Sequence, residues 1–324
     1  MGLGRYVSAR VVWGVAVSII ITTITFLLLS FAPNPAIREA ATRAALEGQD
    51  PAEAAERVRE LRGLDRPLHV RYLDFIENVY TLEWGWSEYR SQPVTEALGD
   101  ALYYTAQYSI PWTILTVTLG PLVGVYSAAN MYSWKDHAAT GFAFFGYAIP
   151  NFFFGIILLL VFGRTLEWVP VIYNTDVAVF SFENAKQLFL PVFVLVTGSI
   201  GATMRIARNE SAEFINADFM KTAKAKGVTP RRAFAFHVLR PTMVPLSTTV
   251  VGQLLAIFLG SSLLVEVVFG IPGLGRLTYN ALLNQDTNLV LGSTLVFTFI
   301  AVVGNVLEDI IFTILDPRIS YHDN

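Results

Sequence analysis

The stretch ADFMKTAKAKGVTPRRAFAFHVLRP, residues 217–241, is basic and rich in alanine, and it lies between two strongly apolar segments. It holds three Lys and three Arg, and no acidic residue follows Asp218. Asp218 is a favourable N-cap for a helix over FMKTAKAK, and Gly227 stands where a left-handed residue would end that helix. Thr229 and Pro230 then fit the cap and the first position of a second helix. The stretch therefore predicts two short helices with a sharp break between them.

The segments around this stretch are apolar enough to cross a membrane. Of the 324 residues, 53% are apolar and only 15% are charged, and the charges are grouped. A helix needs about 20 apolar residues to cross the hydrocarbon core, whereas the helices of a large soluble core would alternate apolar and charged faces. Six windows without Asp, Glu, Lys or Arg predict an all-α integral membrane protein with six transmembrane helices: 11–37, 101–134, 137–163, 187–204, 241–265 and 287–307.

The first apolar run could also be a signal peptide, because it follows a basic start and ends in SFA at 30–32. However, the run from Val11 to Ala32 is 22 residues long, and the core of a signal peptide has about 7–15 residues. We therefore expect residues 11–32 to be retained as the first membrane helix.

The distribution of Lys and Arg predicts that both termini are cytoplasmic, because short cytoplasmic loops carry an excess of these residues. In this orientation the inner segments hold twelve basic residues, and the short outer loops hold three, Arg164, Lys186 and Arg276. The other eight lie in 33–104, and segments of that length cross largely regardless of charge.

These windows divide the chain into five parts. We expect a cytoplasmic N-terminus at 1–10, membrane helix 1 at 11–32, an extracytoplasmic helical segment at 33–104, a core with membrane helices 2–6 at 105–315, and a cytoplasmic tail at 316–324. The core contains the cytoplasmic loop 205–241, between helices 4 and 5. Within the outer segment, start and stop signals predict helices over Ala36–Leu46, from Asp50 to about Gly63, and from Asp65 and Pro67 onward.

Small residues and prolines inside the windows predict features of the helix packing. Gly120 and Gly124 form a small-xxx-small pair, which lets two membrane helices approach closely. Pro150 lies inside the third window, where a kink is tolerated if neighbours satisfy the freed carbonyl groups.

Three interpretations of the basic stretch remain open on its residues alone. It could be a basic loop that sets the orientation and contacts anionic lipid. It could be a calmodulin-like or nucleic-acid-binding patch, although its cations form no single stripe and no interleaved aromatic residues are placed to stack on bases. It could also be a rigid docking element for a cytoplasmic partner, because Thr222, Ala223 and Ala225 would give the first helix a small-residue face.

The stretch resembles the cytoplasmic loop of binding-protein-dependent ABC importer permeases, in the branch that imports dipeptides, oligopeptides and nickel. DFMKTAKAKG at 218–227 is followed by HVLR at 237–240 and by Pro245; the wider family begins this loop with Glu, where this chain has Lys221. The resemblance extends over nearly the whole chain through GLDRPLHVRY at 63–72, EWGWS at 83–87, QPV at 92–94, IPNFFFG at 149–155, VEVVFGIPGLGRL at 265–277 and LDPRISY at 315–321.

The resemblance implies a transport mechanism. The chain would pair with a homologous second permease subunit, and two cytoplasmic ATPase subunits would bind ATP and Mg and hydrolyse the ATP. An extracytoplasmic binding protein would deliver the substrate, and this chain would bind no cofactor of its own. The first helix of the loop would then be the coupling helix that contacts an ATPase subunit. The residues implied in this contact are Asp218, Phe219, Thr222, Ala223, Lys224, Ala225, Lys226 and Gly227.

The segment GIPGLG at 270–275 is a second candidate site. A dinucleotide-binding motif would need a preceding strand and a βαβ unit, but this segment follows a membrane window on the outer side. We expect a short re-entrant turn near an outer gate, buried in protein; a plain surface turn is the alternative. The residues expected to form this turn are Gly270, Pro272, Gly273 and Gly275.

Polar side chains inside the membrane windows are candidates for lining the transport path. Acidic residues at membrane depth are costly and face the bundle or a cavity. Glu308 and Asp309 could therefore serve a proton relay or, as the family's acid at the position of Asp309 implies, bond to a neighbouring helix. The candidates for the path are Asn151, Gln253, Ser261 and Ser262, and each could equally make an interhelical hydrogen bond.

The sequence predicts that the chain is not an enzyme. It has no cysteine, its four His are far apart, and it contains no H-E-x-x-H, G-x-S-x-G or P-loop motif. We expect no catalytic and no metal site, no nucleic-acid partner, and a place among lipids in a bacterial or archaeal cytoplasmic membrane. The predicted function is a permease subunit of an ATP-driven importer of di- or oligopeptides. The alternatives are import of nickel or oligosaccharides by the same machinery, a stand-alone secondary transporter, or an intramembrane hydrolase, for which no nucleophile and base are found.

Overall fold

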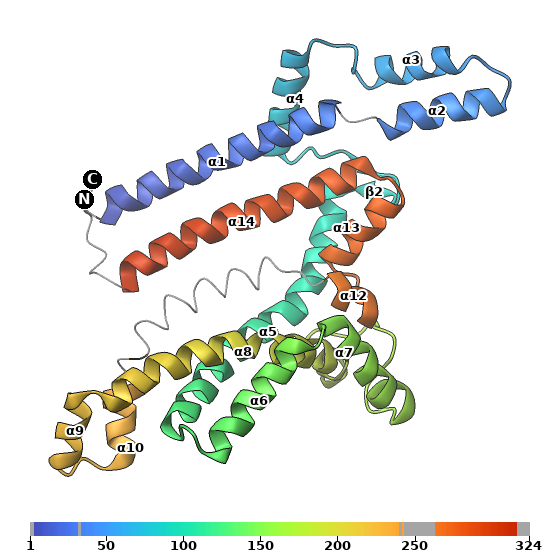
Figure 1. The fold of residues 1–324 in the computed structure, drawn as a ribbon. Helices are drawn as coiled ribbons and strands as arrows, with labels where there is room; N and C mark the ends of the chain where they lie inside the picture. The colour runs from blue at the N-terminus through green and yellow to red at the C-terminus, as the bar shows by residue number, and fades with distance from the viewer. Residues whose placement is uncertain (1–2, 32–33, 240–241, 243–262, 316–324) are drawn as a thin grey trace. The chain divides into compact units, whose positions relative to one another are not determined.

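The computed structural model describes residues 3–31, 34–239, 242 and 263–315, and these residues are mostly helical (Figure 1). Two short strands, β1 (Trp86–Ser87) and β2 (Gln92–Pro93), pair antiparallel. Two π-helical turns, η1 (Leu159–Thr165) and η2 (Phe234–Leu239), follow α7 and α10. The helices are α1 (Leu3–Phe31), α2 (Pro35–Leu46), α3 (Pro51–Leu61), α4 (Leu68–Thr81), α5 (Val94–Ala129), α6 (Trp134–Ala148), α7 (Asn151–Leu158), α8 (Phe182–Asn216), α9 (Asp218–Ala225), α10 (Pro230–Ala233), α12 (Leu263–Phe269), α13 (Leu274–Leu283) and α14 (Thr287–Leu315).

Several of the described helices are long and apolar enough to cross a membrane. Four such spans lie within Arg5–Leu46, Val94–Ala129, Phe182–Ile215 and Thr287–Ile310. A fifth is possible if α6 and α7–η1 together form one span. Most of the predicted fifth membrane helix, 241–265, lies outside the described residues, so six spans and cytoplasmic termini remain predictions.

The third predicted membrane helix, 137–163, is not one straight helix. It is broken between α6 and α7, whose axes differ by 100°. The break lies at Ile149 and Pro150, where Ile149 has an extended backbone. Proline has no N–H to donate and disfavours helical backbone in the residue before it. The helix therefore ends before Pro150 and a new helix begins after it, whereas the sequence predicted a kink within one continuous helix.

One compact unit comprises Ser8–Asp100 and Leu277–Val303. In it, α2 and α3 form a helical hairpin, and both begin as predicted with a capping side chain before a proline. Ala36 N donates to Asn34 Oδ1 at 3.0 Å, and Ala52 N donates to Asp50 Oδ1 at 2.8 Å. Gly48, between the two helices, has a left-handed φ of +71°. The third helix of this segment, α4, begins directly after Pro67 rather than at Asp65.

Contacts between distant segments hold this unit together. Phe26 of α1 packs against the rings of Tyr72 and Phe75 of α4, with centroids 5.4 Å away in each case. Asp286, before α14, accepts hydrogen bonds from Ser87 Oγ at 2.6 Å and from Leu289 N at 3.0 Å. The same carboxylate therefore caps α14 and holds the β1–β2 hairpin against it.

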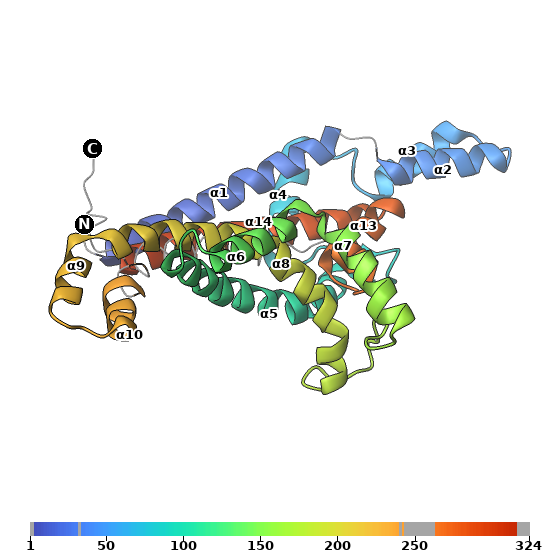
Figure 2. The ribbon, with the colours of Figure 1, turned by 60° about the horizontal axis from the view of Figure 1, so that its bottom comes forward.

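The other unit comprises Ala101–Arg276 together with residues at both ends of the chain. Helices α5, α6 and α8 form its centre, and α6 packs against α8 (Figures 1 and 2). The predicted close approach at Gly124 is confirmed, because a Cβ built there would lie 2.3 Å from Met204 O of α8. The largest buried cluster of this unit lies nearer the start of α5 and includes Tyr108, Trp112, Val194, Leu195, Val265 and Ile271.

Candidate functional site

The basic stretch forms the two helices that its sequence predicts. Gly227, between α9 and α10, has a φ of +75°, a left-handed backbone that glycine adopts without strain. Val228 N donates to Ala223 O at 3.2 Å and so closes the end of α9. Pro230 is the first residue of α10, as predicted. Both short helices lie beyond the end of α8 in the two ribbon views (Figures 1 and 2).

The start of α9 differs slightly from the prediction. Asp218 is its first helical residue, and Ala217 takes the cap position before it. The carboxylate of Asp218 accepts a hydrogen bond from Lys221 Nζ at 2.8 Å. Both side chains are exposed, so solvent screens this ion pair and it contributes little to stability.

One face of α9 is buried against the segment that follows it. Ala223 was expected on an exposed small-residue face, but only 5% of it is exposed, so this part of the prediction is wrong. The reason is that Ala223 lies one turn after the buried Met220 and shares its face of the helix. The apolar cluster here consists of Met220, Ala233 and Val238, with Phe214, Ile215, Val228 and Phe234 packed against it.

A second face of α9 is exposed in the part of the chain that is described, although the ring of Phe219 also contacts Phe214, with centroids 6.4 Å apart. Phe219 is 46% exposed, and Thr222 and Lys226 are also exposed. These residues recur at i, i+3 and i+7 and therefore lie along one side of the helix. Ala225 is exposed as well, as predicted, whereas the side chain of Lys224 lies outside the described residues. The candidate docking face thus consists of Phe219, Thr222 and Lys226.

The turn at 270–276 is buried and does not lie on the surface. Gly270 follows α12 with a φ of +72°, and Gly270 N donates to Val267 O at 3.4 Å. Gly273 is buried, and so is Gly275, whereas Pro272 is partly exposed. These observations disfavour the plain surface turn.

The buried carboxylate of Glu266 organises this turn. Glu266 Oε1 accepts hydrogen bonds from Tyr108 OH at 2.7 Å and Thr105 Oγ1 at 3.0 Å, both on α5. Glu266 Oε2 accepts one from Arg276 N at 2.8 Å. A Cβ on Gly273 would lie 2.2 Å from Glu266 Oε1, so any side chain there would displace the carboxylate. The glycine is therefore required by close packing.

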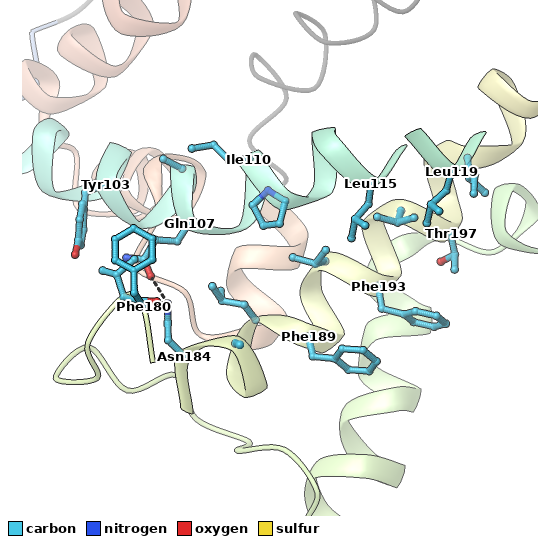
Figure 3. Close-up of a pocket in the computed structure, with 18 of the residues that line it drawn as sticks. Tyr103, Gln107, Ile110, Leu115, Leu119, Phe180, Asn184, Phe189, Phe193 and Thr197 are labelled. Carbon is cyan, nitrogen blue, oxygen red and sulfur yellow. Dashed lines mark hydrogen bonds between the residues drawn. The ribbon is translucent and has the colours of Figure 1, made fainter. Parts of the chain in front are cut away.

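An apolar pocket of about 760 Å³ lies between α5 and α8. Aliphatic side chains make up most of its lining, and Tyr103, Phe180, Phe189 and Phe193 add aromatic surface (Figure 3). Its polar end is built by Gln107, whose Oε1 accepts a hydrogen bond from Asn184 Nδ2 at 3.0 Å. The other wall residues include Ile110, Leu115, Leu119, Phe142, Leu188, Val192, Val196, Thr197 and Ile200. Such a surface can accept apolar groups, with amide groups at one end to orient them.

A buried ion pair connects the α5–α6 turn to α8. Asp136 is 2% exposed, and its two oxygens accept from Nε and Nη2 of Arg208, each at 2.9 Å. The carboxylate also accepts from Ser127 Oγ and from Tyr132 N, the latter at 2.9 Å. Tyr132 has a φ of +64°, which is unfavourable for a side chain of this size. The carboxylate thus holds a strained turn against the helix that leads into α9.

The predicted path-lining residues are not brought together in the described part of the chain. Asn151 begins α7 and lies against Gly198 of α8, where an added Cβ would be 2.2 Å from Asn151 Oδ1. It does not line the large pocket, and its role in the path stays a prediction. Gln253, Ser261 and Ser262 lie outside the described residues. Glu308 and Asp309 are partly buried in α14.

Sequence reasoning assigned no role in a buried polar site to Glu266, Thr105, Tyr108, Asp136 or Arg208; Tyr108 was expected in an aromatic belt at the membrane interface, but it is 0% exposed within the protein. Glu266 and Asp136 each carried a signal, because an acid stands directly beside an apolar window in both cases. Their partners carried none. In the described part of the chain no cluster of three or more His, Asp or Glu could hold a metal ion.

Comparisons with known proteins agree with this architecture. Residues 120–321 match the family described as "Binding-protein-dependent transport system inner membrane component". The chain is 33% identical to a Brucella abortus protein named as a candidate peptide transport system permease, over 96% of this chain and 98% of that protein. It is 31% identical to an oligopeptide transport system permease protein of Bacillus subtilis, over 98% and 100%. It is 28% identical to a dipeptide transport system permease protein of the same organism, over 99% of each chain.

Proposed function

The chain belongs to the family of binding-protein-dependent transport system inner membrane components, and on this premise we propose that it is a permease subunit of an ABC importer of peptides. The observation that carries the proposal is the match along nearly the whole length with relatives named as peptide, oligopeptide and dipeptide permeases. The several membrane-capable helices agree with a multi-pass membrane protein. The family is one of transport components, so we assign the chain no chemical reaction.

We propose that α9 is the coupling helix of this permease. Its exposed face, Phe219, Thr222 and Lys226, would contact one of two cytoplasmic ATPase subunits, which bind ATP and Mg. Support comes from the buried cluster around Met220, which makes α9 and the following segment one rigid element at the end of α8. A rigid element can transmit a displacement, whereas a mobile loop would absorb it.

We propose that the apolar pocket between α5 and α8 forms this chain's half of the transport path, with a homologous second permease subunit supplying the other half. Peptides differ widely in their side chains but share amide groups. A wide apolar wall with amide side chains at one end, Gln107 and Asn184, fits such a mixed substrate. In this proposal an extracytoplasmic binding protein delivers the peptide, and six helices with cytoplasmic termini cross a bacterial cytoplasmic membrane.

Reconstitution in lipid vesicles tests the proposal. The chain is co-purified with its second permease and ATPase subunits, and uptake of labelled di- and oligopeptides is measured with ATP and the binding protein. Nickel and oligosaccharides serve as competing substrates. The proposal is supported if peptide uptake requires ATP and the binding protein, and if substitution of Phe219 abolishes it. Uptake by this chain without ATPase subunits would instead identify a secondary transporter.

A further inference from the structure

Glu266 lies at the junction of α12, the following helix α13, and α5, whose contacting residues are 158 and 161 positions away in the chain. It belongs to α12, its side chain is fully buried at 0% exposed, and it binds two hydroxyl groups of α5 and one backbone N–H of α13. A buried carboxylate is costly unless its acceptor sites are satisfied. Here Thr105, Tyr108 and Arg276 provide the donors, so these hydrogen bonds form only when all three segments are in place.

The two ends of the turn at 270–276 are held by the same group of residues. Leu274 N donates to Thr105 Oγ1 at 2.8 Å, and that hydroxyl donates onward to Glu266. Arg276 donates from Nη1 to Gly270 O at 2.5 Å, which joins the end of the turn to its beginning. Ile271, at the tip, is 0% exposed. The turn therefore has little freedom to move without α5.

The part of α5 that binds the turn also lines the apolar pocket, through residues on the opposite side of the helix. Tyr103 and Gln107 line the pocket, and each is two positions from Thr105. Positions two apart on an α-helix lie about 200° apart around its axis. One side of α5 thus binds the turn, and the opposite side forms the pocket wall.

We propose that Glu266 is a positioning residue for transport, which fixes the 270–276 turn to α5 so that the turn and the α5 wall of the pocket move as one body. The proposal rests on the proposed function of the chain as a permease. It assigns no substrate contact to Glu266, which acts through α5 and the turn.

Matched variants in reconstituted vesicles test this proposal. Glu266→Gln keeps the shape but replaces one acceptor oxygen with a donor NH₂, and Thr105→Val removes a bridging hydroxyl that Thr105→Ser retains. Thr116→Val is the control, because Thr116 is a buried residue of the same helix whose hydroxyl has no hydrogen-bond partner among the described residues. We expect Glu266→Gln and Thr105→Val to lower peptide uptake by about tenfold or more, as for a buried hydrogen-bonding group that is left without its partner.

Two further readouts separate positioning from folding. Subunit assembly and basal ATP hydrolysis should be unchanged, while stimulation of hydrolysis by the loaded binding protein should fall. A cysteine in place of the buried Ile271, read by thiol alkylation in the chain that otherwise has none, should react faster in Glu266→Gln and Thr105→Val. Thr105→Ser and Thr116→Val should match the parent in every readout.

Three results would overturn the proposal: full uptake in Glu266→Gln, loss of subunit assembly in both Glu266→Gln and Thr105→Val, or an alkylation rate that these two changes leave unaltered. Failure of the proposed function has a different signature. In that case the parent itself takes up no peptide, and the alkylation rates at position 271 still decide whether Glu266 holds the turn to α5.

Discussion

The guanidinium of Arg208 in α8 clasps the carboxylate of Asp136 at the start of α6 with two parallel hydrogen bonds of 2.9 Å each. The two residues are 72 positions apart in the chain, and the pair is largely removed from solvent, with the Asp136 side chain 3% and the Arg208 side chain 23% exposed. This contact holds the α5–α6 turn against α8, the helix that leads directly into α9.

Asp136→Asn should destabilise the protein strongly. The substitution leaves the partly exposed guanidinium of Arg208 without its charged partner, which costs about 1–3 kcal/mol. We expect a clear fall in the melting temperature of the purified protein in detergent. Arg205→Gln is the control: Arg205 lies one turn earlier on α8 and is exposed, and exposed substitutions change stability by about 0.5 kcal/mol or less. Equal melting temperatures for both variants would show that the pair is dispensable.

Gly124→Ala should weaken the packing of α5 against α8. The added methyl group would lie 2.3 Å from Met204 O and 2.7 Å from Ala207 Cβ, so the helices must separate. Overpacking of this kind costs about 1–3 kcal/mol. Gly99→Ala, on the same helix with nothing within 4 Å of its Cβ position, should instead be neutral or stabilising through helix propensity. Thermal unfolding of both variants measures the difference, and a fall in stability for Gly99→Ala as large as that for Gly124→Ala would contradict the close-packing explanation.

Gly227→Val should disrupt coupling, whereas Gly227→Asn should preserve most of it. The φ of +75° is strained for a β-branched residue, but asparagine tolerates left-handed backbone. The valine variant should reach the membrane and then either lose the ATPase subunits during purification or hydrolyse ATP without uptake. Uptake and ATP hydrolysis are measured in vesicles. If the stretch only contacted lipid, both variants would transport normally, since every Lys and Arg remains.

Single cysteines should report the topology, because the native chain contains none. Glu60→Cys, exposed on α3, should react with an impermeant thiol reagent added outside intact cells. Ala225→Cys, exposed on α9, should react only after the membrane is permeabilised. Labelling of both from the same side would rule out the proposed orientation.

Much of the helical architecture was readable from the sequence, because it depends on local rules. Charged side chains cannot enter the hydrocarbon core cheaply, so charge-free windows mark the apolar helices. Helix caps depend on residues within one helical turn. The sequence therefore correctly predicted the start of α3 at Asp50 and Pro51, and the end of α9 at Gly227. Most of the window 241–265 lies outside the described residues and is untested by the structure.

The tertiary structure alone decided which polar groups meet. The hydroxyl donors of Glu266 come from 158 and 161 positions away, so nothing in the neighbouring sequence identifies Thr105 or Tyr108. Ala223 appeared available on an isolated helix and is buried because the chain returns against that face. A sequence shows what each residue can donate, accept or bury locally. Which partner satisfies a buried group depends on how helices far apart in the chain pack together, since that packing sets both the distance and the exclusion of water.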